Sequence, residues 1–531
     1  MKIKTLAVLI FLLSFGVADA RVDKAKKPVS QGNYVATNQY YTHLISGTNP
    51  RVAELNIFAN LLPKGGDIHH HYAGAIYAET YLEWARKKNY CIYRESDHKL
   101  KVQKYHIDTR PADELAEEAG KICISADAVR KDNAFYRDLL MRWSDKDYGN
   151  HFHEQLAPDL QFFSTFGFIS PVAGAAYKEG LLDLKDRAKA ENVQYLETML
   201  EKSPEINNQK YANKINNLKD ENTDEEMEAV FNEFADFMAN DPAAKAKIES
   251  YVKNMEEAAA EIDDADFKLR FQAYVTRNDD PAKVFSCLYS AFAAAESSAL
   301  IVGVNIVGPE NGYVAMRDYS LHMKMFRFLN ERFPGIKLSL HAGELALGMV
   351  PPEGLKSHVR EAVEIAMADR IGHGVDIAHE TDPDELLEVL KERKVAIEVN
   401  LTSNSFILGV KNEAHPVQIY RYHNVPFVIS TDDPGVSRNN LSGEYLLFMT
   451  RYRPSYEELK KVVYNSIRYS FLGETEKAVE LESLDRRFAA FEDRIAKLAS
   501  SGRSSSAAVD RKSAKVAKTS AGARKSKSRG R

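Results

Sequence analysis

The stretch IVGVNIV at residues 301–307 is almost continuously apolar and rich in β-branched side chains. Such a run is typical of a parallel strand that is covered on both faces. A helix-like stretch follows it, and the same alternation recurs along the chain. The expected strands are residues 66–71, 193–200, 269–276, 299–307, 337–341, 370–375, 395–401 and 426–431. Eight such units predict an α/β fold, a closed (β/α)8 barrel of the TIM type.

The spacing of these strands predicts two insertions within a barrel that spans residues 61–495. More than 120 residues separate the first expected strand from the second, whereas the last five follow one another about every 30 residues. Residues 89–130 are polar and irregular, and they predict a small insertion in the first connection. Residues 207–266 are rich in Ala, Glu, Lys and Met at helical spacing, and they predict an extra helical insertion.

Residues 1–20 have the pattern of a signal peptide. Lys2 and Lys4 precede an apolar run over residues 6–17, and Ala18-Asp19-Ala20 has the small-x-small form of a cleavage site. The run is shorter than the roughly 20 residues that a membrane span needs, and no later segment is long and apolar enough. We therefore expect an exported protein, secreted or periplasmic, with no transmembrane segment. Residues 21–60 form an N-terminal extension that we expect to cover the barrel or to contact a partner subunit.

Export bears on the three cysteines, because disulfides persist outside the cytosol. Cys91 and Cys123 flank one polar segment and could close a loop of about 30 residues, worth ~3 kcal/mol in the chain-entropy model. Cys287 lies in the apolar stretch 284–292 and is predicted to be a buried, inert thiol. The first insertion is thus a candidate disulfide-bearing element.

The composition, 44% hydrophobic and 28% charged, excludes a disordered or fibrous chain as a whole. The C-terminal end differs, because residues 501–531 carry ten Lys or Arg against Asp510 alone. Residues 496–531 lack apolar periodicity and are predicted to be a disordered basic tail. A solvated tail is the favoured interpretation, and contact with anionic surfaces or nucleic acid is the alternative.

Polar side chains gather where the expected strands end, and barrel enzymes place their catalytic residues there. The first strand ends in His69-His70-His71. Since residues i and i+2 of a strand share a face, His69 and His71 can converge on one metal ion while His70 points away. A His-x-His pair alone is weak evidence for a metal site, so a third ligand is needed.

Three later strand ends supply further candidates, reading HAGE at 341–344, RIGHG at 370–374 and STDDPG at 430–435. The glycine between His341 and Glu344 lets the chain turn tightly. The histidine between two glycines predicts a close approach of the backbone to a ligand. Two adjacent carboxylates after an apolar strand are costly unless a cation or hydrogen bonds hold them. The conjunction of these patterns at four strand ends predicts a catalytic site.

Together with PKGGDIHHH at 63–71, the runs SLHAGE at 339–344, GHG at 372–374 and STDDP at 430–434 resemble the adenosine deaminase family of the amidohydrolase superfamily. The resemblance covers about residues 55–490, with the motifs in the family's order. The PKGG run, the signal peptide and the cysteine-bearing insertion look more like the secreted growth-factor-type branch than the cytosolic one. For that branch the resemblance makes a homodimer plausible.

The resemblance implies one Zn2+ per chain, which lowers the pKa of a bound water towards ~7. The ligands that it implies are His69, His71, His341 and Asp432. Three His and one Asp suit Zn2+ and would also accept Co2+ or Fe2+. His373 would lie beside the water and either orient it or take its proton.

The resemblance also implies how a purine base is held. Glu344 would protonate N1, which requires a carboxyl pKa raised by burial. Asp433 would hydrogen-bond N7, and the backbone of Gly308 would meet N3. The implied reaction is hydrolytic deamination of adenosine, and of 2′-deoxyadenosine, to an inosine-type nucleoside and ammonia, catalysed by a hydrolase acting on a cyclic amidine carbon–nitrogen bond.

One departure from the family pattern concerns the ribose. The cytosolic branch has an Asp two residues after the second His of its His-x-His motif, and this chain has Ala73 there. The secreted branch often has an acidic residue immediately after that His, and this chain has Tyr72 there. The alternatives therefore stay open: another 6-aminopurine such as adenine, AMP or a modified nucleoside, or a secreted signalling or binding protein that keeps the barrel. An inventory of Arg and Lys at the mouth discriminates a phosphate-bearing substrate.

Overall fold

The computed structural model describes residues 31–97, 102–110, 114, 122–150, 155–219 and 222–526. The predicted signal peptide, residues 1–20, lies outside them. No helix in these ranges is both long enough and apolar enough to cross a membrane.

Eight parallel strands form the centre of the molecule, and each overlaps one of the expected strands. They are β1 (Gly65–Asp67), β4 (Val193–Thr198), β5 (Lys268–Thr276), β6 (Ile301–Val307), β7 (Ser339–Ala342), β8 (Arg370–His373), β9 (Ala396–Val399) and β10 (Phe427–Ile429). The first four pair in the order β1-β4-β5-β6 and the last four in the order β7-β8-β9-β10. Parallel bridges between Val304 and Leu338 and between His70 and Asp432 join the two sheets. The predicted (β/α)8 barrel is confirmed.

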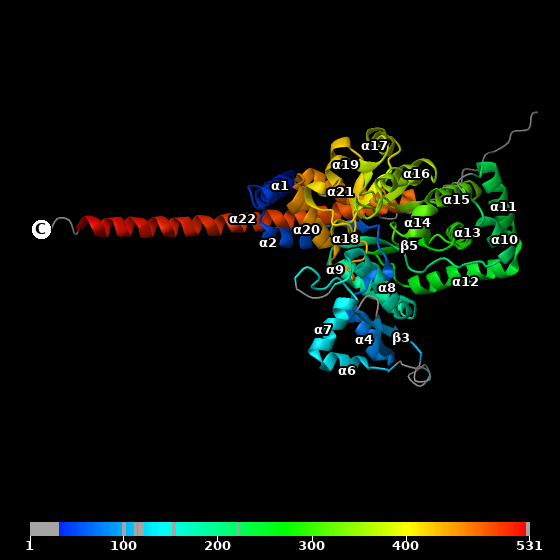
Figure 1. Cartoon of the computed structure of the whole chain (residues 1–531). Coiled ribbons are helices and arrows are strands. Elements are labelled where there is room, and N and C mark those ends of the chain that lie inside the picture. Colours follow the sequence, from blue (N-terminus) through cyan, green and yellow to red (C-terminus); the bar gives the residue numbers. More distant parts are fainter. Residues whose placement is uncertain are drawn as a thin grey trace, which may run out of the picture.

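Helices surround this barrel (Figure 1), because most of the crossovers return through at least one helix. Those after β5 to β10 are α13 (Pro281–Ser297), α14 (Tyr313–Arg317), α15 (Tyr319–Arg332), α16 (His358–Glu364), α17 (Pro383–Glu392), α18 (Leu401–Ile407), α19 (Val417–His423), α20 (Leu441–Tyr452) and α21 (Tyr456–Arg468), with short 3-10 turns η1 (Pro352–Leu355), η2 (Ile377–His379) and η3 (Asn412–Ala414). Helix α13 is buried along most of its length, and Cys287 lies within it as the predicted buried thiol.

The first insertion is more regular than the sequence indicates. It contains an antiparallel hairpin of β2 (Cys91–Asp97) and β3 (Val102–Asp108), and the Cys91–Cys123 disulfide ties its first strand to the segment before α6. The hairpin packs on neighbouring helices. The polar composition of residues 89–130 does not indicate this packing. The helices of this connection are α3 (Tyr72–Ala75), α4 (Ala78–Lys88), α6 (Ala126–Lys131), α7 (Asn133–Arg142), α8 (Pro158–Gly174) and α9 (Tyr177–Ala190). The second insertion is helical as predicted, with α10 (Gln209–Ile215), α11 (Asp224–Asn240) and α12 (Pro242–Ala259).

The N-terminal extension and the C-terminal helix pack together. Helices α1 (Gln31–Ile45) and α2 (Val52–Leu61) contact α20, α21 and α22 (Glu474–Ser526), and Phe58 forms an edge-on contact with Phe491 of α22. Beyond this contact α22 projects away from the barrel (Figure 1) and is helical as far as Ser526. The predicted disordered tail, 496–531, thus has helical backbone over most of its length, since its Ala, Lys and Arg residues favour helix and it holds no proline.

Candidate active site

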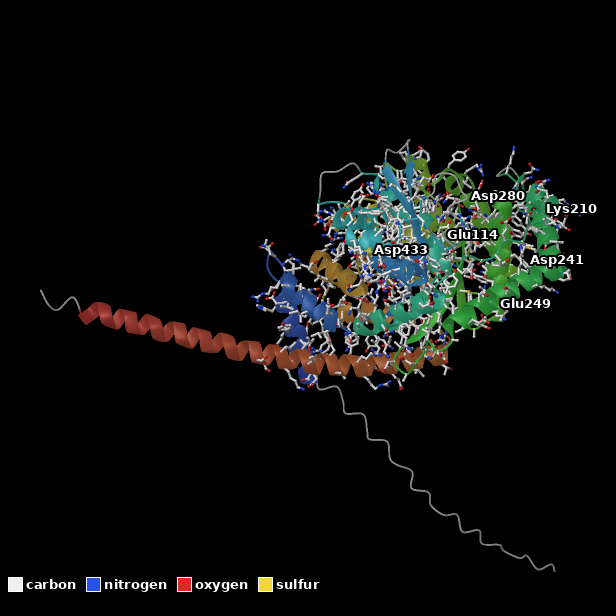
Figure 2. All side chains as sticks on the ribbon, turned by 90° about the horizontal axis from the view of Figure 1, so that it is seen from below. Glu114, Lys210, Asp241, Glu249, Asp280 and Asp433 are labelled. Atoms are coloured by element: carbon white, nitrogen blue, oxygen red, sulfur yellow. A yellow bond between two sulfur atoms is a disulfide. The ribbon has the colours of Figure 1, made fainter. Side chains whose placement is uncertain are left out.

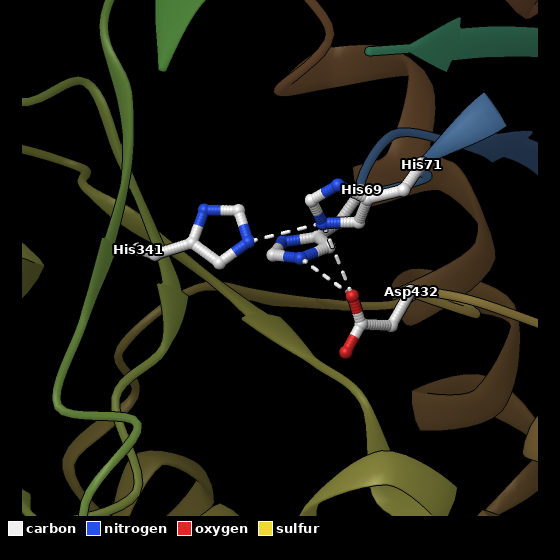
Figure 3. A group of neighbouring side chains, drawn as sticks. All are labelled: His69, His71, His341 and Asp432. Carbon is white, nitrogen blue, oxygen red and sulfur yellow. Dashed lines mark hydrogen bonds and ion pairs between the residues drawn. The ribbon is translucent and has the colours of Figure 1, made fainter. Parts of the chain in front are cut away.

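Four metal-ligating side chains converge at the carboxyl ends of β1, β7 and β10. His69, His71, His341 and Asp432 each offer one atom to a group whose members all lie within 4.8 Å of one another (Figure 3). Nε2 of His71 lies 3.1 Å from Nε2 of His341 and 3.2 Å from Oδ1 of Asp432, and Nε2 of His69 lies 3.4 Å from the same oxygen. His70 points elsewhere and bonds Thr198, as the alternation of a strand requires.

Hydrogen bonds behind the imidazoles leave Nε2 as the free ligating atom. Nδ1 of His69 lies 2.6 Å from Oε2 of Glu398, and Nδ1 of His341 lies 2.9 Å from Oδ1 of Asn305. Oδ1 of Asn305 also accepts from the Ile306 amide, so it is an acceptor and its partner nitrogen carries the proton. Two Nε2 lone pairs therefore face one carboxylate in a buried space, and in the described chain Nε2 of His69 has no hydrogen-bond partner. This donor set fits a divalent cation such as Zn2+.

The glycines around His373 have a role other than the predicted one. A Cβ on Gly372 would lie 2.7 Å from Cε1 of His69, and one on Gly374 would lie 2.7 Å from the Tyr420 hydroxyl. The expectation that these glycines let the backbone approach a ligand is therefore wrong, because they make room for protein side chains. His373 itself has φ +70°, a left-handed conformation that is rare for residues other than glycine and that tight packing must hold.

Glu344 is placed by a buried carboxylate that the sequence did not single out. Glu310 accepts the amide protons of Gly343 at 3.1 Å and Glu344 at 2.8 Å, and it also contacts Arg277 and His358. Gly343 has φ +71°, as the predicted tight turn requires. The only sign of a role for Glu310 in the sequence is its position directly after Gly308 and Pro309.

Burial favours the neutral form of Glu344, Asp433 and His341, whereas Asp432 stays ionised, and hydrogen bonds to Asp432 and Glu398 outweigh burial and raise the pKa of His69 to about 10. Burial, and then the nearby Asp432, raise the pKa of Glu344 well above its ordinary value. The same two causes raise the pKa of Asp433. Burial, together with the neighbouring histidines, lowers the pKa of His341 and holds it in the neutral form that ligates metal. At neutral pH the site therefore presents carboxyl groups that can donate protons.

These groups open into a cavity of about 420 Å³, a volume typical of small-molecule sites. Figure 2 labels Asp433 among the packed side chains of the centre, whereas Lys210 and Glu249 lie at the outer edge of the helical insertion. None of the lining residues in the described ranges is Lys or Arg. The lining comprises His71, Ala73, Phe162, Phe163, Phe166, Ser170, Met199, Tyr274, Thr276, Val307, Gly308, Pro309, His341, Glu344, His373, Asp432 and Asp433.

Ala73 and Tyr72, which stand where the family has its ribose-contacting acids, face different parts of the protein. Ala73 lines the cavity and offers it only a methyl group. Tyr72 lies in the helix layer, where its hydroxyl donates to the Ala176 carbonyl at 2.7 Å and its ring fits against Gly180. Tyr72 is therefore a packing residue, and three phenylalanines of α8 contribute to the lining of the cavity: Phe162, Phe163 and Phe166.

Comparisons with known sequences match part of this chain to adenosine deaminases. Residues 239–487 match the family model described as adenosine deaminase. Adenosine deaminase of Clostridium perfringens is 32% identical over 176 residues, 33% of this chain and 48% of the relative, and that of Vibrio parahaemolyticus is 32% identical over 188 residues, 35% and 51%. The matched region thus spans about half the length of these curated relatives.

Solved structures share the fold at lower identity. Adenine deaminase from Arthrobacter aurescens has a TM-score of 0.51 at 16% identity, covering 80% of this chain and 98% of its own. The N6-methyl-AMP deaminase from Arabidopsis thaliana has a TM-score of 0.51 at 17% identity, covering 81% and 98%. At these identities the likeness supports the barrel and leaves the substrate open.

Proposed function

We propose that this chain belongs to the adenosine deaminase family and removes the 6-amino group of adenosine and 2′-deoxyadenosine by hydrolysis. The observation that carries the proposal is a single cavity that brings the His69, His71, His341 and Asp432 donor set together with Glu344, His373 and Asp433. A divalent ion held by that donor set would acidify water at neutral pH.

The chain's own side chains perform the remaining steps. Water adds to C6 of the purine while the neutral carboxyl of Glu344 gives its proton to N1, so the ring loses aromaticity without building negative charge. The raised pKa of Asp433 keeps a proton on that carboxyl for a hydrogen bond to N7, and Oδ1 of Asp433 has no partner among the described residues. The amide of Gly308 meets N3. The proton first released by the water restores the Glu344 carboxyl, and the added hydroxyl then gives its proton to the amino group as the C6–N bond breaks and ammonia leaves.

The charge of the cavity favours a nucleoside over a nucleotide. A 5′-phosphate carries about two negative charges at neutral pH and is normally held by Arg, Lys or backbone amides. The described lining offers no such cation and holds Glu344, Asp432 and Asp433. A 5′-phosphate would therefore be buried near the ionised Asp432 with no Lys or Arg to hold it, and we expect AMP to be a poor substrate.

The test is the loss of ultraviolet absorbance of adenosine, 2′-deoxyadenosine, adenine and AMP with zinc-loaded full-length protein, beside Glu344→Gln and a chelator-treated sample. The proposal predicts turnover of the two nucleosides, weak or no turnover of AMP, and inactivity of both controls. Turnover of AMP at the adenosine rate contradicts the nucleoside assignment. A metal-loaded protein that converts none of the four contradicts the function.

We also propose that the protein is exported, and the Cys91–Cys123 disulfide supports this, because such bonds persist in oxidising compartments. N-terminal sequencing of the protein produced in its native host tests the cleavage after Ala20. A mature chain that begins at Met1 contradicts export through this signal.

A further inference from the structure

A line of hydrogen bonds runs from the first turn of α19 to His373. The amide of Val417 donates to Nδ1 of His415 at 3.2 Å. Nε2 of His415 lies 3.1 Å from Oδ1 of Asn404 on α18, and Nδ2 of Asn404 lies 2.9 Å from Nδ1 of His373. The three side chains are all buried, at 2%, 0% and 1% exposure.

The direction of every proton in this line follows from its first member. A backbone amide can only donate, so Nδ1 of His415 is an acceptor and carries no proton. The imidazole of His415 must then hold its proton on Nε2 and donate it to Oδ1 of Asn404. This fixes the orientation of the amide, whose Nδ2 donates to Nδ1 of His373. The proton of the neutral His373 ring is therefore on Nε2.

That proton points into the cavity. Nε2 of His373 lies 3.7 Å from Oε1 of Glu344 and 3.9 Å from Oδ2 of Asp432, and it has no hydrogen-bond partner within the described chain. A buried N–H that its surroundings do not satisfy destabilises the fold, which is acceptable where a reacting group completes the bond. The space between the three groups is where an oxygen can accept it.

We propose that Asn404 and His415 are positioning residues that lock His373 in the Nε2–H form, so that His373 orients the reacting oxygen by donating a hydrogen bond and does not take its proton. The proposal rests on the proposed function for the identity of that oxygen. The tautomer of His373 itself depends on the protein alone. It decides between the two roles that the resemblance left open for His373.

The decisive variant is Asn404→Asp, which has the same shape and replaces the donor by an acceptor. The carboxylate introduced at this position can accept from both His415 and His373, so the fold keeps its hydrogen bonds while Nδ1 of His373 gains the proton. We expect kcat to fall by about 10²-fold or more with KM changed less than about threefold, because the donor acts on the reacting oxygen. His415→Gln, whose amide can still donate to Asn404, should keep most of the activity, whereas His415→Leu should lose it.

A readout that needs no substrate separates this proposal from the proposed function. In zinc-loaded protein labelled with 15N-histidine, with His373 assigned by a His373→Asn variant, we expect a protonated Nε2 and an unprotonated Nδ1, and the reverse or a doubly protonated ring in Asn404→Asp. A protonated Nδ1 in the wild-type protein overturns the proposal, and so does an Asn404→Asp variant with wild-type kcat. If no purine is converted, the proposed function is wrong. The 15N shifts of His373 still test whether Asn404 and His415 fix its tautomer.

Discussion

Glu398 accepts a hydrogen bond from Nδ1 of His69 at 2.6 Å, and its other oxygen binds the guanidinium of Arg370. One buried carboxylate thus links the imidazole of His69, a proposed metal ligand, to the ion pairs of the barrel interior, where Arg370 also contacts Glu197 at 2.6 Å. The Arg370 charge keeps the pKa of Glu398 at about 2 although burial alone would raise it. The carboxylate therefore stays ionised and can orient His69.

Substituting Glu398→Gln should weaken zinc binding by about 10- to 100-fold, because the amide no longer accepts a charge-assisted bond from His69 with the same strength. Competition against a chromogenic chelator measures this. Glu388→Gln, on the exposed face of α17, is the matched control and should bind zinc like the wild type. Equal zinc affinity of the Glu398 variant would contradict a role in orienting His69.

Glu344→Gln should reduce kcat by about 10²- to 10⁴-fold, since the amide keeps the size of the side chain and lacks an acidic proton. Metal content and Tm should stay unchanged, because the buried acid is already neutral in the folded protein. In the wild type, activity should fall as the pH rises through the raised pKa of this carboxyl, where the proton is lost. A variant with more than a tenth of the wild-type kcat excludes Glu344 as the acid.

Gly372→Ala should lower zinc affinity and activity together, because the added Cβ would lie 2.7 Å from the His69 ring and displace it. Isothermal titration with Zn2+ measures the first effect. Gly473→Ala, where an added Cβ meets nothing within 4 Å, should behave like the wild type. If both substitutions are silent, the close contact between Gly372 and His69 does not set the geometry of the site.

Stability should decline between about pH 5 and pH 8 through Glu380. Burial raises the pKa of this carboxyl to about 7 from an ordinary 4.5, so the folded state holds a proton that the unfolded state has already released. The stabilisation from this bound proton is complete below the pKa that Glu380 has in the unfolded state. It is lost as the pH rises through the pKa that Glu380 has in the folded state. Glu380→Gln should raise the free energy of unfolding by about 1–3 kcal/mol at pH 8 and by much less at pH 5. If the stability of the wild type and of Glu380→Gln changes with pH in parallel, the prediction is wrong. The exposed Glu385→Gln is the control variant.

Removing residues 501–531 should leave kcat/KM within about twofold and Tm unchanged, because the last buried side chain described on α22 is Ala499, before the cut. The apolar anchors of this helix on the body are Leu484, Phe488, Phe491 and Ile495. Binding to heparin beads should be lost in the truncated protein and should weaken with salt in the full chain. A marked loss of activity would show that the C-terminal segment contributes to the folded body.

The sequence predicted the parts of the site that lie on strong local patterns. Eight apolar runs marked the barrel strands, and the period of a strand alone placed His69 and His71 on one side and His70 on the other. Asn305 and Glu398 were visible as single polar residues within apolar strands, and a buried polar group requires a partner. Which partner each one contacts depends on the closure of the barrel, so neither was assigned.

Asn404 and His415 could not be found from the sequence, because they lie in a helix and a loop with no local sign of a role. Their function depends on how α18 and α19 pack beside β8. The misinterpretation of Gly372 has the same origin. A glycine shows that something comes close, and only the fold shows that the neighbour is the His69 ring.

The bridge between His70 and Asp432 joins the first barrel strand to the last. Among the proposed metal ligands, His69 and His71 are thus more than 350 residues away from Asp432 in the sequence, on the other side of the seam that closes the barrel. A chain cut short before β10 lacks both the closing strand and a ligand. Tight zinc retention would therefore report that the chain has been made as far as Asp432 and that the ring is closed, and chelator resistance could be used to follow the folding of this protein.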